Sequence, residues 1–110
     1  MELDDLLALS FLCSSAVTMP LIDIISLTIS SSAGKHAAHI VGHCMEVVAQ
    51  REPAEWADKI NLGFWTRKCV EKWHSSPKVL EGLYALAQAK LVLFLRILSS
   101  TLLNVFPVLR

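Results

Sequence analysis

The stretch that decides the fold is VLEGLYALAQAKLVLFLRILSSTLLNVFPVL, residues 79–109. Its only charged residues are Glu81, Lys90 and Arg96. A run this long and this apolar predicts one helix over 77–106, which at about 1.5 Å per residue is roughly 45 Å long. The rest of the chain is therefore expected either to pack on this helix or to lie beside it in a bilayer.

The composition is more apolar than that of an ordinary soluble domain. Of the 110 residues, 54% are hydrophobic and 18% are charged, and the mean hydropathy is +0.50. Soluble domains usually have about 45–50% apolar and about 25% charged residues. We therefore expect one domain over 1–110 with an apolar surface that is covered by a partner or by lipid.

The charges favour neither nucleic acid nor any other strongly charged partner. Ten basic and ten acidic side chains give a net charge of +0. Binding to nucleic acid requires a basic surface, and the sequence has no basic excess to supply one. The cations gather in the middle of the chain, because residues 1–34 contain no Lys or Arg.

Three widely spaced cysteines, Cys13, Cys44 and Cys69, are an odd number and do not indicate a disulfide framework. Buried, inert thiols in a reducing compartment are the simplest interpretation. The first residues, MELDD, lack the positive charge that secretory and mitochondrial signals carry. A cytoplasmic or other reducing intracellular location is therefore expected, with an intracellular membrane as the alternative.

The spacing of apolar residues predicts an all-α chain with no sheet. Prolines at 20, 53 and 77 mark helix starts, and Asn61 to Gly63 mark a break. Short connections favour antiparallel neighbours, so we expect four or five antiparallel helices in a compact bundle or a short α-solenoid-like stack. The expected helices cover residues 3–17, 20–30, 33–50, 53–73 and 77–106.

Three histidines and a glutamate form the polar side of the predicted helix over 33–50: His36, His39, His43 and Glu46. Histidines four residues apart on a helix can bind one metal ion. Ile40 occupies the position at which zinc proteases carry their general base, so the motif is not theirs. A solvated face of an amphipathic helix explains the same pattern, and we favour it. No cofactor is expected.

Five further residues are candidates for contact with a partner. Trp56, Trp65 and Trp73 suit either a core or an interface, where tryptophan is enriched. Lys90 and Arg96 lie in the apolar last helix, where a charge must reach water or an acidic partner. Asp23 is one suggested partner for Lys90.

No catalytic constellation is present, so we expect a non-enzymatic helical interaction or assembly module. It would present an apolar helical surface to a protein partner or to a second copy. The alternative is a small integral-membrane subunit in which residues 6–30 and 86–106 span the bilayer and the helical middle is cytoplasmic. A span needs about 20 apolar residues. Asp23 inside the first span costs about 2.5–3.5 kcal/mol on insertion scales.

Overall fold

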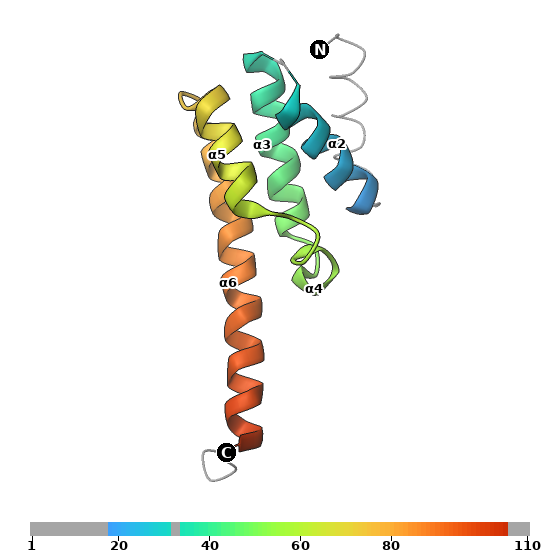
Figure 1. Ribbon diagram of the computed structural model, residues 1–110, viewed down its shortest axis with the longest axis vertical. Coiled ribbons are helices and arrows are strands. Elements are labelled where there is room, and N and C mark those ends of the chain that lie inside the picture. The colour runs from blue at the N-terminus through green and yellow to red at the C-terminus, as the bar shows by residue number, and fades with distance from the viewer. Residues whose placement is uncertain (1–17, 32–33, 106–110) are drawn as a thin grey trace.

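The computed structural model describes residues 18–31 and 34–105, and these residues form helices joined by short turns, with no strand among them. The predicted all-α class is confirmed. The helix expected over 3–17 lies outside the described residues. The helices are α2 (Thr18–Ser30), α3 (Lys35–Ala49), α4 (Pro53–Trp56), α5 (Leu62–Trp73) and α6 (Pro77–Val105) (Figure 1).

Local chemistry explains where several of these helices begin. Pro53 and Pro77 are the first residues of α4 and α6, where the fixed φ of proline suits a helix and no N–H is lost. Asn61 precedes α5, and its side-chain oxygen accepts a hydrogen bond of 3.1 Å from the backbone N–H of Phe64. The helix expected over 53–73 is therefore two helices, because residues 57–61 are not helical and Asn61 caps the start of α5.

The helices are not all antiparallel, and in this respect the sequence prediction is wrong. The pairs α2/α3 and α5/α6 run antiparallel, but α3 and α6, which make the largest helix–helix contact, run parallel (Figure 1). Glu46 meets Lys78, and further along both helices Glu52, just after α3, meets Arg96. The reason is that α5 brings the chain back toward the end of the bundle at which α3 begins, and α6 then starts from that end.

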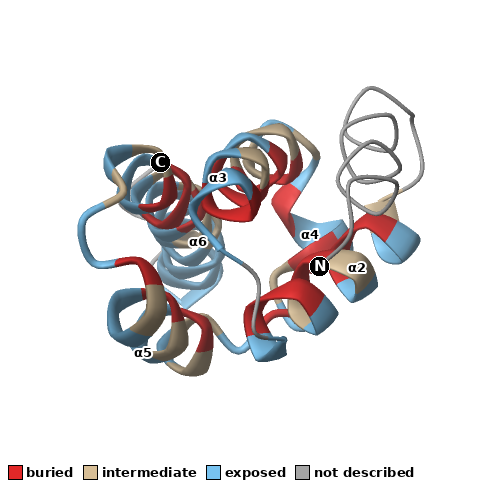
Figure 2. Cartoon of the chain, turned by 90° about the horizontal axis from the view of Figure 1, so that it is seen from above, coloured by how far each residue is buried: buried red, intermediate tan, exposed pale blue. Residues whose placement is uncertain are grey.

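The core lies between α2, α3, α5 and the first half of α6, and Figure 2 shows the buried faces turned toward one another. Every helix contributes apolar side chains to it. The whole of α2 is thirteen residues long, and its buried side chains pack inside this core. The most buried large residues are Leu21, Ile25, Ile29, Val41, Met45, Val48, Trp56, Val79 and Leu86.

Two glycines let the backbones of α3 and α6 touch. A Cβ atom added to Gly42 would lie 2.3 Å from the carbonyl oxygen of Lys78, and one added to Gly82 would lie 2.6 Å from the carbonyl oxygen of Gly42. Real Cβ atoms essentially never approach so closely. The first half of α6 is therefore fixed against α3 at a distance that only glycine permits.

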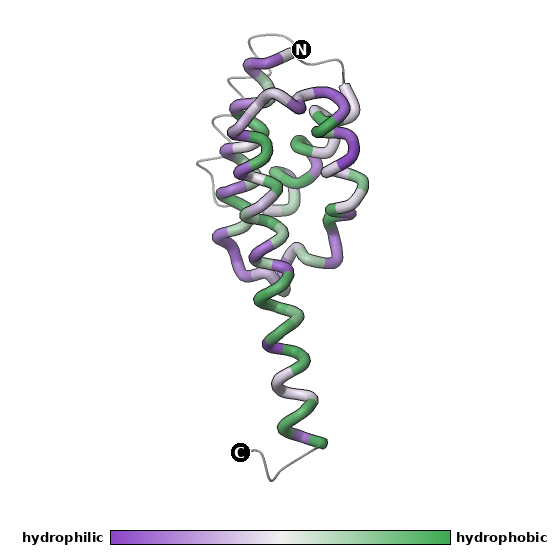
Figure 3. Tube along the Cα trace, turned by 90° about the vertical axis from the view of Figure 1, so that its left-hand side faces the viewer, coloured by the Kyte–Doolittle hydropathy of each residue, from purple (hydrophilic) through white to green (hydrophobic). Residues whose placement is uncertain are grey.

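The second half of α6 projects beyond the other helices (Figures 1 and 3). After Leu86 no described residue of α6 is buried. The cause is length, since α6 has 29 residues and α3 has 15. We call residues 91–105 the stalk, and the other described residues, including 77–90 of α6, the head.

Candidate interaction surface on the last helix

A line of exposed side chains follows the outer side of α6 from the head to the end of the stalk. Its members alternate at spacings of four and three residues, which places them on one face of a helix. All of them are exposed. We call this line the outer stripe: Tyr84, Gln88, Leu91, Leu95, Leu98, Leu102 and Val105.

The outer stripe faces away from the head. The buried residues of α6 are Val79, Gly82, Leu83 and Leu86, which pack on the helices of the head. At 3.6 residues per turn, these positions lie about half a turn from the stripe. The head therefore holds α6 from one side and leaves the opposite side open along its length.

The edges of the outer stripe are apolar or uncharged. Phe94 and Val92 lie on either side of it and are exposed. With six apolar members of the stripe, they make eight large apolar side chains that are 41% to 65% exposed. A contiguous exposed apolar surface of this kind marks an interaction site on a soluble protein or a site that meets lipid.

Two of the three cations of α6, Lys90 and Arg96, are held by the head. Arg96 Nη1 lies 3.3 Å from Glu52 Oε1, and both side chains are about half exposed. Lys90 Nζ donates a hydrogen bond of 3.2 Å to the carbonyl oxygen of Ile60. Asp23, suggested from sequence as the partner of Lys90, is instead exposed on α2. Both cations therefore lie off the outer stripe and attach α6 to the head.

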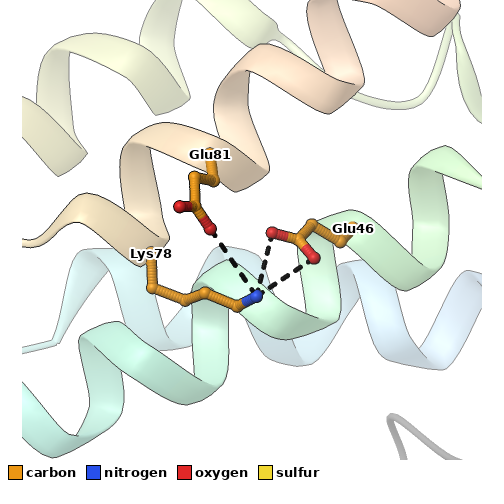
Figure 4. Close-up of polar contacts among 3 residues, drawn as sticks. All are labelled: Glu46, Lys78 and Glu81. Atoms are coloured by element: carbon orange, nitrogen blue, oxygen red, sulfur yellow. Dashed lines mark hydrogen bonds and ion pairs between the residues drawn. The ribbon is translucent and has the colours of Figure 1, made fainter.

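A third cation, Lys78, joins α3 to α6 at the other end of their contact (Figure 4). Its Nζ lies 3.0 Å from one carboxylate oxygen of Glu46 and 3.7 Å from Glu81 Oε2. The hydrogen bond to Glu46 raises the pKa of Lys78 above its ordinary 10.5, and the charges of both carboxylates add to this effect. Glu46 is therefore engaged in holding the two helices together.

The histidine face on α3 does not come together as a metal centre. His36, His39 and His43 are exposed, while Glu46 is bound to Lys78. Within residues 18–31 and 34–105, no group of three or more His, Cys, Asp or Glu side chains is placed to hold a metal ion. The solvated face of an amphipathic helix accounts for this stripe.

The three tryptophans belong to the core and not to an interaction surface. Trp56, Trp65 and Trp73 are at most 4% exposed. Trp56 Nε1 donates a hydrogen bond of 3.4 Å to the carbonyl oxygen of Arg51, which satisfies its polar atom inside the core. They pack in the core around α4 and α5, together with Ile60.

The two described cysteines are both fully buried but differ in state. Cys69 is a free thiol, and burial raises its pKa to about 11, so it is unreactive at neutral pH. Cys44 is disulfide-bonded, so its interpretation as an inert thiol is wrong. Because disulfides persist in oxidising compartments, the cysteine count gives no argument for a reducing one.

Sequence reasoning found the apolar last helix but missed the outer stripe on it. The signal was present, since seven residues alternate at spacings of four and three from Tyr84 to Val105. It was hidden because other faces of the stalk also carry leucine and isoleucine, such as Leu93 and Ile97. Burial of the opposite face distinguishes the stripe only beside the head, because no described residue of α6 after Leu86 is buried.

The length and hydropathy of α6 also bear on whether this helix could cross a membrane. In the part of the chain that the structure describes, α6 is the one helix long and apolar enough to cross a bilayer.

Comparisons with protein-family models, curated proteins and solved structures find no match to this chain. Its function must therefore be argued from its own surface.

Proposed function

We propose that this chain is a non-enzymatic assembly module that binds a helix of a protein partner along the outer stripe of α6. One observation carries the proposal: six of the seven members of the stripe are apolar, and all seven are exposed along more than twenty residues of α6. Burial of apolar surface is the main favourable term in association, at about 25 cal/mol for each Å² removed from water. A helix laid along the stripe would remove much of this surface from water.

The head supports this role by making α6 rigid. Gly42 and Gly82 bring the backbones of α3 and α6 into contact, and Lys78 joins the same two helices. Arg96 extends the attachment to the first turns of the stalk. A surface held in a fixed conformation before binding loses less entropy when the partner arrives.

Site-specific photocrosslinking in cells tests this proposal. A benzophenone amino acid replaces Leu98 on the outer stripe in one variant and Ser100, on the other side of the stalk, in the control. We expect a discrete protein adduct from position 98 and none from position 100. Equal adducts from both positions, or adducts to lipid alone from position 98, would contradict a protein-binding stripe.

A membrane subunit is the second candidate, and the length and exposure of α6 favour it. It would have one described spanning helix and not two, because α2 packs inside the core of the head. Five of the nine residues from 96 to 104 are polar, and an Arg at mid-bilayer alone costs about 2.5–3.5 kcal/mol on insertion scales. This is why we place the protein partner first.

An alkaline wash of the membrane fraction separates the two candidates. An assembly module is released by the wash or is found in the soluble fraction. A chain that remains in the membranes until detergent is added favours the membrane subunit, and Arg96 would then lie at the membrane.

A further inference from the structure

We propose that the helix that covers the outer stripe is α6 of a second copy of this chain, so that two stalks pair side by side. This inference rests on the proposed function, because it names the partner of the same surface.

The spacing of the outer stripe is that of a coiled coil. Gln88, Leu95 and Leu102 fall seven residues apart, as the first (a) positions of successive heptads. The fourth (d) positions are Tyr84, Leu91, Leu98 and Val105. A strict repeat of seven keeps one face of a helix against another over its whole length. The spacing of the outer stripe therefore suits pairing with another helix.

The positions beside the stripe permit a second copy as the partner. In coiled coils, charged residues at these flanking positions select the partner. Here all of them are uncharged: Leu80, Ala85, Ala87, Val92, Phe94, Ser99 and Thr101. Glu81 is the nearest charge in line with the stripe, and Lys78 lies 3.7 Å from its carboxylate. Two copies of α6 therefore meet no unbalanced like charges.

The exposed area is what a stable dimer needs. A large aromatic side chain has roughly 150–250 Å² to bury, and a leucine somewhat less. Eight side chains that are 41% to 65% exposed therefore present about 800 Å² together. A standard interface buries about 800 Å² on each partner.

The position of the head also permits this pairing. The head packs on the side of α6 that is opposite to the outer stripe, so a second stalk can approach without meeting the first head. A twofold dimer uses the same patch on both copies, and this stripe would face its own equivalent.

Sedimentation equilibrium of the full chain tests the inference. The stripe variant carries Leu95→Lys and Leu98→Lys; the matched control carries Ile97→Lys and Ser100→Lys, with the same added charge off the stripe. We expect wild type and control to be dimers, and the stripe variant to have a Kd raised about 100-fold or more, since two apolar contacts are lost on each copy. Circular dichroism melting should give the same midpoint for both variants under monomeric conditions.

Three other results would overturn the pairing of two stalks. A wild-type chain that is monomeric at every concentration, a control that dissociates as readily as the stripe variant, or a dimer that reductant abolishes would each overturn the pairing. If wild type is monomeric while position 98 crosslinks to another protein, the proposed function stands and only this inference fails. If wild type is monomeric and position 98 crosslinks to no protein, both fail.

Discussion

The two halves of α6 are both rich in apolar residues but have opposite surroundings. Residues 77–90 contribute four buried residues to the head, whereas residues 91–105 contribute none and are the more apolar of the two (Figure 3). The difference comes from the neighbours, because α3 ends at Ala49 and does not extend beside the stalk. Hydropathy alone therefore does not distinguish a core segment from an interface.

The largest expected contrast is between Leu86→Ala in the head and Leu98→Ala in the stalk. Leu86 is fully buried, so its truncation leaves a cavity and should lower the free energy of unfolding by about 2–5 kcal/mol. Leu98 is 41% exposed, and its truncation should stay within about 0.5 kcal/mol in the monomer. Urea denaturation at a concentration where the chain is monomeric measures both. Equal losses would mean that the stalk is also part of the core.

The next largest loss of stability is expected from a substitution at the backbone contact that fixes the first half of α6. Gly42→Ala places a methyl group against the carbonyl of Lys78 and should cost about 1–3 kcal/mol in unfolding free energy. Gly63→Ala is the matched control, because its nearest neighbour is the Asn61 side-chain oxygen at 3.7 Å. The control should remain within about 1 kcal/mol of wild type or gain stability. A tolerated Gly42→Ala would show that α3 and α6 separate easily.

Much of the fold can be predicted from the sequence because single residues determine where several helices start. Pro53, Pro77 and Asn61 set helix starts through their own chemistry, so the helix bounds follow within a few residues. The parallel course of α3 and α6 is different, because it depends on how α5 returns the chain. No local pattern encodes that path, and short loops wrongly suggested antiparallel neighbours throughout.

The candidate surface was only partly predictable for a similar reason. The apolar last helix is plain from its composition, and the repeat of the outer stripe is present in the sequence. The partners of the cations of α6 could not be predicted from the sequence. Lys90 meets Ile60 and Arg96 meets Glu52, across 30 and 44 residues of chain. The tryptophans could be assigned to the core only once their burial was known.

A smaller effect is expected from Lys78, which joins the two helices beside the glycine contact. Its pKa is raised above 10.5 in the folded chain, so its stabilising contribution is fully present below the unfolded pKa and is lost as the pH rises through the folded pKa. Lys78→Met should therefore lower the melting temperature at neutral pH, and the difference from wild type should disappear as the pH rises through the raised pKa of Lys78. A difference that persists unchanged at high pH would point to lost packing instead of lost charge.

The smallest effect should come from Arg96→Gln, at the boundary between head and stalk. Arg96 and Glu52 are both about half exposed, and ion pairs of this kind contribute roughly 0–1 kcal/mol. The unfolding free energy should change by less than about 0.5 kcal/mol, and salt should reduce even that. Because the pair lies off the outer stripe, dimerisation in sedimentation equilibrium should be unaffected. If Arg96→Gln dissociates the dimer, the head positions the stalk through this ion pair, and the two halves of α6 are coupled more closely than their burial implies.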